Sequence, residues 1–145
     1  MSSDVEHKSP GDEQYDDLIK AAIQVRERAY VPYSHFKVGA ALLAKSGKVY
    51  LGCNIENGAY SPTICAERAA LASALSAGEK PGSFTAIAVV GSQSHPTTPC
   101  GVCRQVLYEL APGCTVVMEP PPDLGKGRLV MSVEELLPAG FTLED

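Results

Sequence analysis

The sequence predicts an α/β protein, a three-layer α/β/α sandwich around a mixed five-stranded sheet. Helical and extended segments follow one another in the order α, β, β, α, β, α, β, β, α. Two of the extended segments are continuously apolar, as strands buried on both faces are. The chain has 145 residues, of which 45% are hydrophobic and 20% charged, so it can bury one core of ordinary globular composition.

The first part of the chain has the pattern of a helix followed by a β-hairpin. Residues 14–30 carry apolar side chains at the i, i+4, i+7 spacing of a one-faced helix, and Pro32 is expected to end it. Two short apolar segments follow at 38–44 and 49–55, joined by the Lys-Ser-Gly-Lys turn at 45–48. This arrangement predicts two paired antiparallel strands.

Helix and strand then alternate. Residues 65–77 are rich in Ala, Leu, Glu and Arg and predict a helix, which Gly78 is placed to end. The run Phe-Thr-Ala-Ile-Ala-Val-Val at 84–90 predicts a strand with both faces buried. A second helix is expected over 100–110, before the Pro-Gly pair at 112–113.

Two further strands and a short helix are expected in the last part of the chain. Residues 114–118 predict another buried strand, and residues 128–131 predict the last one. Ser132 and Glu135 match the Ser-x-x-Glu capping box, which opens a short helix that Pro138 ends.

The chain is expected to form one domain over residues 14–145, because no linker, repeat or low-complexity segment interrupts it. The polar residues 1–13 are expected to be a flexible tail, without the features of a secretory signal or a transit peptide. No apolar run approaches the roughly 20 residues that a membrane span needs. We therefore expect a cytoplasmic protein.

The net charge of the chain disfavours some classes of binding partner. Twelve basic and seventeen acidic residues give a net charge of −5. A general binder of nucleic acid or of membrane surfaces is expected to carry a basic patch instead. The composition therefore favours a small-molecule partner, with no nucleic acid and no membrane.

The five cysteines are an odd number, and in a reducing cytosol they are metal ligands, catalytic groups or core residues rather than disulfides. Cys100 and Cys103 stand at i, i+3 near the start of a predicted helix, so their side chains share one helix face. Cys65 opens the preceding predicted helix. A parallel arrangement brings both helix N-termini to the sheet edge where open α/β folds bind ligands.

Three thiolates at helix N-termini are suited to Zn²⁺, since the helix dipole lowers the pKa of a thiol there. Cys53 and Cys114 lie within predicted strands, and the three histidines show no pairing, so the pattern offers no fourth ligand. A zinc site with three protein ligands and one open position is the catalytic type.

Glu67 stands two residues after Cys65, in the first predicted turn of the same helix, where it could reach a water at the open position. An acid at this point also complements the helix dipole without any catalytic role. The Cys100–Cys103 pair on its own fits a thiol–disulfide protein equally well, but such a protein has no use for Cys65 or Glu67.

Cys65-Ala66-Glu67 together with Pro99-Cys100-Gly101-Val102-Cys103 matches the zinc deaminase signature, in which His or Cys, any residue and Glu precede Pro-Cys-x-x-Cys. The likeness continues in residues 33–42, 52–57, 104–105 and 135–138. Over residues 15–142 the chain resembles the small, homotetrameric cytidine deaminases. The tail and the loop at 120–127 carry no motif of that family.

The resemblance implies one zinc ion per chain, held by Cys65, Cys100 and Cys103. It implies hydrolytic deamination of cytidine and 2′-deoxycytidine to uridine and 2′-deoxyuridine with release of ammonia, a reaction of pyrimidine salvage. Glu67 would move protons between water and the pyrimidine, and Arg68 would donate hydrogen bonds to the ligand sulfurs. As an isolated residue, Arg68 could equally be a solvated side chain on the helix surface.

The resemblance also implies a set of substrate contacts. Asn54 and Glu56 alternate along a strand and would bind the ribose, Phe36 would pack on the pyrimidine, and the backbone of Ala66 would contact the base. Phe141 would be supplied by a neighbouring subunit, and Tyr60 lies in a segment that the family uses between subunits. As bare aromatic residues, Phe36 and Phe141 could equally be core.

The expected assembly is a homotetramer whose active sites are shared between subunits. An alternative function keeps the chemistry and changes the substrate to a cytosine-containing antibiotic. The Asn54 and Glu56 pair favours nucleosides over that alternative. A polynucleotide editor is the least favoured, because the chain is acidic and shows no basic channel.

Overall fold

A computed structural model describes residues 10–143 of the chain. Its elements, in chain order, are α1 (Pro10–Arg26), β1 (Gly39–Ala44), β2 (Val49–Cys53), α2 (Ala66–Ser76), β3 (Phe84–Val90), α3 (Gly101–Leu110), β4 (Thr115–Met118), β5 (Leu129–Ser132) and α4 (Val133–Leu136). The five strands form one sheet in the order β2-β1-β3-β4-β5. Only the β3–β4 pair is parallel, so the sheet is mixed, as the sequence predicts.

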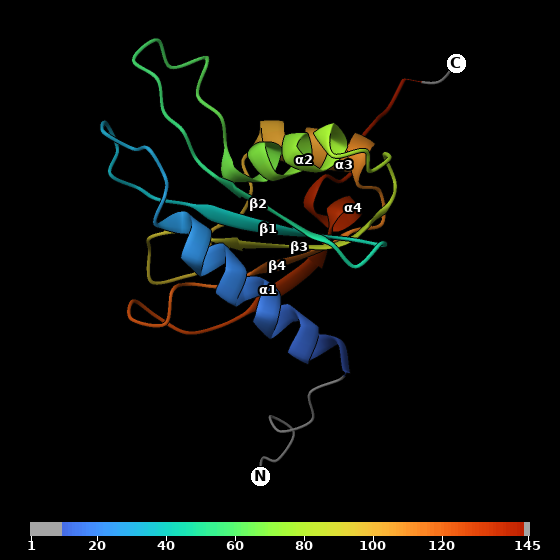
Figure 1. Cartoon of the computed structure of the whole chain (residues 1–145), viewed down its shortest axis with the longest axis horizontal. Coiled ribbons are helices and arrows are strands. Elements are labelled where there is room, and N and C mark those ends of the chain that lie inside the picture. The colour runs from blue at the N-terminus through green and yellow to red at the C-terminus, as the bar shows by residue number, and fades with distance from the viewer. Residues whose placement is uncertain (1–9, 144–145) are drawn as a thin grey trace.

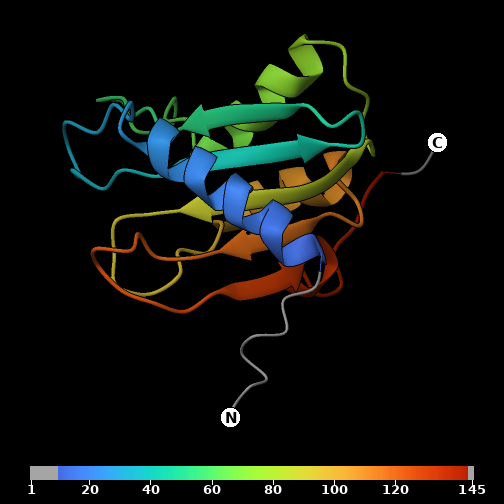
Figure 2. The same ribbon diagram turned by 60° about the horizontal axis from the view of Figure 1, so that its bottom comes forward.

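The helices form a layer on each face of the sheet. Figures 1 and 2 show α1 crossing the strands on one face, while α2, α3 and α4 cover the other. The order of elements and the α/β/α layering confirm the predicted fold class. Within residues 10–143, no helix has the length and apolar character to cross a membrane.

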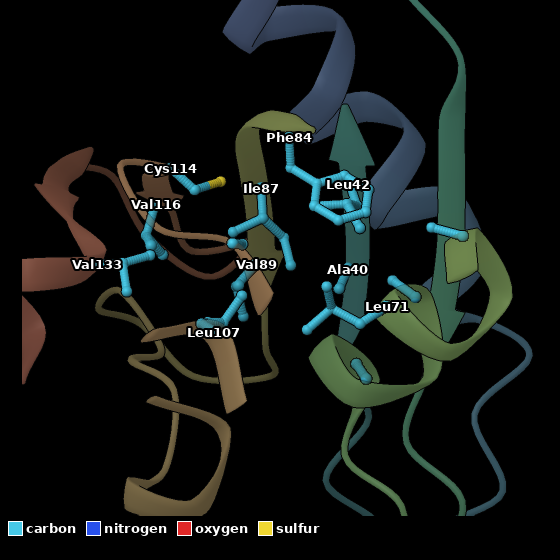
Figure 3. Packing of buried hydrophobic residues seen from close by; sticks show 14 of the residues in the cluster. Ala40, Leu42, Leu71, Phe84, Ile87, Val89, Leu107, Cys114, Val116 and Val133 are labelled. Carbon is cyan, nitrogen blue, oxygen red and sulfur yellow. The ribbon is translucent and has the colours of Figure 1, made fainter. Parts of the chain in front are cut away.

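The core has two parts, because the central strands are buried on both faces. Every residue of β1 is buried, and the strand's side chains alternate between the two faces. Leu42 packs with Leu71 and Phe84 under α2, as Figure 3 shows, whereas Leu43 packs on the α1 side. Ile87 of β3 joins the larger cluster. Full burial of such a side chain contributes about 1.5–3 kcal/mol, so these strands anchor both helix layers.

The predicted end of the first helix is wrong. Helix α1 ends at Arg26, well before Pro32. Tyr30 instead pairs with the chain that follows β2: its N–H donates to the Asn54 carbonyl at 3.0 Å, and its carbonyl accepts from the Glu56 N–H at 2.8 Å. This long-range pairing requires an extended backbone, which a helix running on to residue 30 could not supply.

The other differences are at element ends. Helix α1 begins at Pro10, inside the segment expected to be a tail, and residues 1–9 of that segment lie outside the described residues. Strand β3 has the predicted bounds. Cys114, expected within a strand, is buried one residue before β4. The capping box is confirmed, since Ser132 Oγ accepts from the Glu135 N–H and Glu135 Oε1 from the Ser132 N–H.

Gly52 sets the distance between β2 and α2. A Cβ atom at this position would collide with the Ala66 carbonyl oxygen and the Ala70 nitrogen. The absence of a side chain therefore lets the first turn of α2 lie directly against the strand. This contact places Cys65, the residue before α2, beside the chain that leaves β2 at Asn54.

Candidate active site

Two helices begin at the same edge of the sheet and bring three cysteines together. Cys65 is the N-cap of α2 and Cys100 the N-cap of α3, both with extended backbones, and neither side chain caps its helix. Their Sγ atoms lie 3.8 Å apart. Cys103, one turn into α3, is fully buried, and its sulfur completes a group whose atoms all lie within 4.8 Å of one another. The predicted meeting of the two helix N-termini is confirmed.

This donor set fits zinc. Four ligands at the Zn–S distance of about 2.3 Å in a tetrahedron lie about 3.8 Å from one another, which is the observed separation of Cys65 and Cys100. No fourth His, Cys, Asp or Glu among the described residues joins the group. Three sulfur ligands leave one coordination position for water or substrate, as in catalytic zinc sites.

Cys65 and Cys103 shift each other's pKa in opposite directions. The hydrogen bond from Cys103, together with Arg68, lowers the pKa of Cys65 to about 5. The same hydrogen bond and burial raise the pKa of Cys103. Cys65 is therefore the thiolate of the metal-free pair, and Cys103 keeps the proton. Zinc needs all its sulfur ligands deprotonated, so its binding releases that proton.

Arg68 is the positive charge beside this cluster. Its Nη2 donates to Cys65 Sγ at 3.6 Å and to the Thr63 carbonyl at 3.3 Å. The contact with Cys65 raises the pKa of the guanidinium further, so the charge is permanent. Three thiolates with Zn²⁺ carry one net negative charge, which the guanidinium offsets.

Glu67 is buried in the first turn of α2, with 4% of its surface exposed. Burial raises the pKa of its carboxyl group to about 7 in the metal-free protein. Glu67 lines a cavity together with Cys65 and Cys100 but is not part of the sulfur group. A carboxyl that both accepts and releases a proton near neutral pH is thus placed next to the metal position.

The cavity has a volume of about 180 Å³ and collects residues from four parts of the chain. Its lining consists of Val38, Asn54, Glu56, Thr63, Cys65, Ala66, Glu67, Thr97, Thr98 and Cys100. The structure thus brings the predicted residues Asn54, Glu56 and Ala66 into the same cavity as two of the three clustered cysteines, Cys65 and Cys100. Sequence analysis missed Thr63, Thr97 and Thr98, which stand in loops without periodicity. The one sequence feature that could have identified them is that each stands two or three residues before a cysteine of the cluster.

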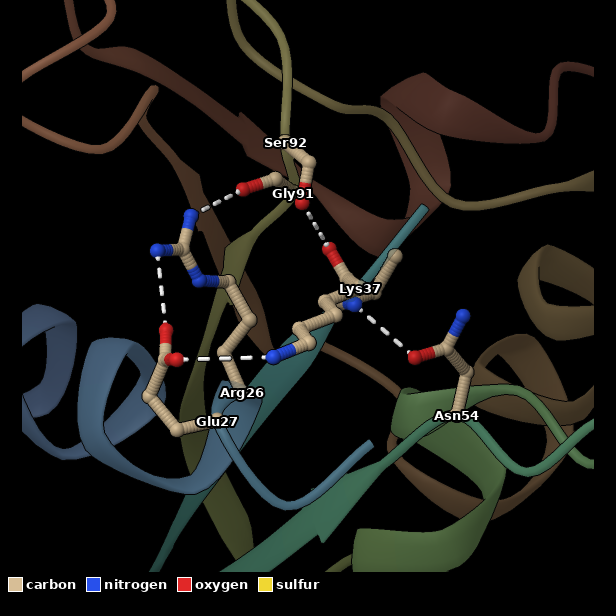
Figure 4. A network of polar contacts seen from close by, with 7 residues as sticks. Arg26, Glu27, Lys37, Asn54, Gly91 and Ser92 are labelled. Carbon is tan, nitrogen blue, oxygen red and sulfur yellow. Dashed lines mark hydrogen bonds and ion pairs between the residues drawn. The ribbon is translucent and has the colours of Figure 1, made fainter. Parts of the chain in front are cut away.

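Asn54 holds the loop that precedes β1. Its Oδ1 accepts from the Val38 N–H at 2.8 Å, the bond drawn at Asn54 in Figure 4. Its Nδ2 donates to the Phe36 carbonyl, also at 2.8 Å. The amide therefore shapes this wall of the cavity, and it keeps one N–H and one lone pair for a ligand. The Phe36 ring is half-buried, packs against Gly91 and is not among the lining residues.

Glu56 fixes a neighbouring stretch of the same loop. Its Oε1 accepts from the N–H groups of Tyr33 and Ser34 at 3.0 and 3.1 Å. Hydrogen bonds from Ser34, followed by that from Tyr33, lower the pKa of Glu56, so the carboxylate is charged at the mouth of the cavity. A second hollow of about 320 Å³ adjoins the first one there, and Glu56 and Thr63 line both.

Two of the predicted aromatic residues lie apart from the cavity of their own chain. Tyr60 is 77% exposed, has a positive φ of 65° and lines the second hollow. Phe141 is 65% exposed, and its carbonyl accepts from Gln105 Nε2 at 3.2 Å. Neither ring therefore contributes to the metal-side cavity within one chain.

A polar network behind the cavity joins α1 to two strand ends (Figure 4). Arg26 Nη1 donates to the Gly91 carbonyl at 2.8 Å, and Ser92 Oγ donates to the Lys37 carbonyl at 2.7 Å. Glu27 bridges the side chains of Arg26 and Lys37. The network ties the segment that follows β3 to the loop that Asn54 holds.

Comparison with known proteins agrees with this geometry. The family model described as the cytidine and deoxycytidylate deaminase zinc-binding region matches residues 12–119. A cytidine deaminase of Halalkalibacterium halodurans is 53% identical over 128 residues, 88% of this chain and 94% of that protein. A blasticidin-S deaminase of Bacillus cereus is 33% identical over 138 residues, covering 87% and 91%. The crystal structure of cytidine deaminase from Burkholderia pseudomallei superposes with a TM-score of 0.81, at 51% identity and coverage of 87% and 98%.

The Cys103→Ala substitution should abolish zinc binding, because it removes the buried sulfur of a three-sulfur site. Metal analysis of the purified protein should give one zinc ion per chain for the unmodified chain and close to none for the variant. Cys114→Ala is the matched control, since Cys114 is equally buried but stands outside the cluster. Stoichiometric zinc in Cys103→Ala would contradict the ligand assignment.

Proposed function

The chain belongs to the cytidine and deoxycytidylate deaminase family, and we propose from this premise that it hydrolyses cytidine and 2′-deoxycytidine to uridine and 2′-deoxyuridine with release of ammonia. The supporting observation is a buried carboxyl, Glu67, which lines one cavity together with a zinc-fitting cluster of three sulfurs. Such a pair combines a metal activator with a separate proton carrier, which hydrolytic deamination requires.

Cys65, Cys100 and Cys103 would hold the zinc ion, which would supply the Lewis acidity that lowers the pKa of a water in the open position. Glu67 accepts the proton of this water on a carboxylate oxygen. It delivers this proton to N3 of the pyrimidine as the water oxygen bonds to C4. It then passes the second water proton to the 4-amino group, the C4–N bond breaks, and ammonia leaves a C4 carbonyl behind. Because Glu67 is not a metal ligand, it moves protons without disturbing the coordination.

The burial of Glu67 serves this role. Its carboxyl is shielded from bulk water, so protons pass between it and the substrate rather than to solvent. Arg68 keeps the sulfur cluster from accumulating uncompensated negative charge. Less negative sulfurs leave the metal a stronger Lewis acid.

The nucleoside is proposed to lie in the cavity with its base toward Glu67. The ribose hydroxyls would meet the charged carboxylate of Glu56 and the remaining N–H of Asn54. The backbone of Ala66 would contact the base, and the Phe36 ring would approach it from the wall near Gly91. Pyrimidine salvage in the cytoplasm is the corresponding role.

A homotetramer with shared active sites is the proposed assembly. Large apolar side chains are exposed on the segment around the second hollow, among them Tyr30, Ile55, Tyr60 and Ile64. Exposed apolar clusters of this kind are typical of interfaces. Phe141 is exposed and does not line the cavity of its own chain, so its ring is available to complete the site of a neighbouring subunit.

The alternative of an antibiotic deaminase rests on the blasticidin-S deaminase of Bacillus cereus. Its identity to this chain is 33%, against 53% for the Halalkalibacterium halodurans cytidine deaminase. An assay that offers cytidine and blasticidin S separately to the purified protein distinguishes the two functions. A thiol–disulfide protein is not favoured, because it leaves Glu67 and Cys65 without a role.

The Glu67→Gln substitution should keep zinc and the fold but lose roughly 10²–10⁴-fold in turnover, since an amide cannot accept the proton. The measurement is the loss of cytidine absorbance, with zinc content determined in parallel. Glu79→Gln, a carboxylate bound by Ser46 and Tyr50 away from the cavity, is the control. If Glu67→Gln lost its zinc instead, the residue would be structural.

The Glu56→Gln substitution should lower kcat/KM for cytidine and narrow the preference against cytidine monophosphate. Two like charges ~6 Å apart repel by roughly 2–3 kcal/mol at an effective dielectric near 20, so the carboxylate disfavours a nearby phosphate. Glutamine keeps an oxygen for the N–H groups of Tyr33 and Ser34, which preserves the loop. An unchanged ratio of the two substrates would show that shape excludes the phosphate.

The Phe141→Ala substitution should raise KM for cytidine while each chain still binds zinc, because the ring is proposed to enter a neighbour's site. Leu143→Ala, an exposed apolar residue close by, is the control. Sedimentation of the unmodified protein should show a tetramer. An active monomer at assay concentration would rule out the shared site.

A further inference from the structure

Arg104 connects the loop that carries one zinc ligand to the end of the last helix. It follows Cys103 in α3 and is half-buried. Its Nε donates to the Pro99 carbonyl at 2.7 Å, and its Nη1 donates to the Leu136 carbonyl at 2.9 Å. Both acceptors are backbone carbonyls, so the guanidinium here is a geometric clamp rather than one half of an ion pair.

The hydrogen bond from Arg104 to Pro99 fixes the backbone next to Cys100. The Pro99 carbonyl belongs to the peptide plane before Cys100, and the Cys100 carbonyl to the plane after it. Arg104 binds the first carbonyl with its side chain and the second with its own backbone N–H at 2.9 Å. One residue thus holds both peptide planes that set the backbone angles of Cys100.

Cys100 needs such support more than its partners do. Cys103 is fully buried and Cys65 is half-buried, whereas Cys100, which lines the cavity, is exposed. The direction of its Sγ therefore depends on its backbone. Pro99 itself is fully buried, so its carbonyl has to find a donor within the protein.

The hydrogen bond from Arg104 to Leu136 anchors the guanidinium to the end of α4. Leu136 is the last residue of α4, where helix carbonyls lack intrahelical partners. The start of α4 is fixed by the capping box of Ser132 and Glu135. A planar guanidinium binds two carbonyls in a set geometry, whereas lysine offers a single ammonium and glutamine a short amide.

We propose that Arg104 is a positioning residue for the metal centre: by clamping the peptide planes around Cys100 against the end of α4, it keeps that sulfur at bonding distance from the ion held by Cys65 and Cys103. The inference rests on the proposed function only in requiring that the three sulfurs hold zinc. Loss of such a supporting contact weakens metal binding by roughly 10–100-fold.

Gln105 provides a matched control. It is the next residue of α3, and its Nε2 donates to the Phe141 carbonyl at 3.2 Å. It therefore also holds the C-terminal segment but makes no hydrogen bond to Pro99. A variant of Gln105 separates an effect on the ligand loop from a general loosening of that segment.

The experiment compares Arg104→Gln, Arg104→Lys and Gln105→Ala with the unmodified protein. Zinc release to a chromogenic pyridylazo chelator is timed, and the visible spectrum of the Co²⁺-substituted protein reports the geometry of the sulfur ligands. Both Arg104 variants should release zinc roughly 10–100-fold faster and alter the cobalt spectrum. Gln105→Ala should match the unmodified protein in both measurements.

Three results would overturn the proposal. Unaltered release and spectra in Arg104→Gln, even with a lower melting temperature, would make Arg104 merely structural. Wild-type behaviour of Arg104→Lys would show that charge suffices, and equal loss in Gln105→Ala would assign the effect to the C-terminal segment. If Arg104→Gln does not fold, Arg104→Lys decides. No substrate is used, so a failure to deaminate cytidine would overturn the proposed function separately.

Discussion

Three sulfur atoms from two helices have to meet within the bonding distance of one metal ion, and the rest of the architecture follows from this constraint. Cys65 and Cys100 can approach to 3.8 Å only because α2 and α3 begin at the same edge of the sheet. Strands β2 and β3 both run antiparallel to β1, so they end at the same edge, and each of these two helices follows one of those strand ends. Gly52 lets α2 lie close enough to β2 for its first turn to share the cavity.

The two helices contribute different chemical groups to the site. Cys65 is the N-cap of α2 and the buried carboxyl of Glu67 follows two residues later, so one sulfur of the metal-binding cluster and the proposed proton carrier come from the same helical turn. Arg68 follows at once and donates to the Cys65 sulfur. A single short segment therefore supplies one sulfur, the proposed proton carrier and a compensating positive charge, whereas α3 and its N-cap supply the other two sulfurs.

Much of this arrangement could be predicted from the sequence, because it is local. The continuous apolar run of β3, the capping box at Ser132 and the helix-opening cysteines are features of neighbouring residues, and the structure has them where the patterns place them. The end of α1 could not be predicted in this way. Helix α1 ends before Tyr30, whose backbone pairs with that of Asn54 and Glu56. A pattern in the residues around Tyr30 cannot reveal this pairing, because its partners are more than 20 residues away along the chain.

The types of the chemically active residues, and the spacings at which Cys65, Glu67, Cys100 and Cys103 stand, can be read directly from the amino-acid sequence. The surroundings of these residues are visible only in the folded chain. It buries Glu67, adds Thr97 and Thr98 to the cavity, and turns the Asn54 amide onto the loop before β1. The physical reason is that side-chain type and helix spacing are written in adjacent residues, whereas burial and hydrogen-bond partners depend on segments that meet only when the chain has folded.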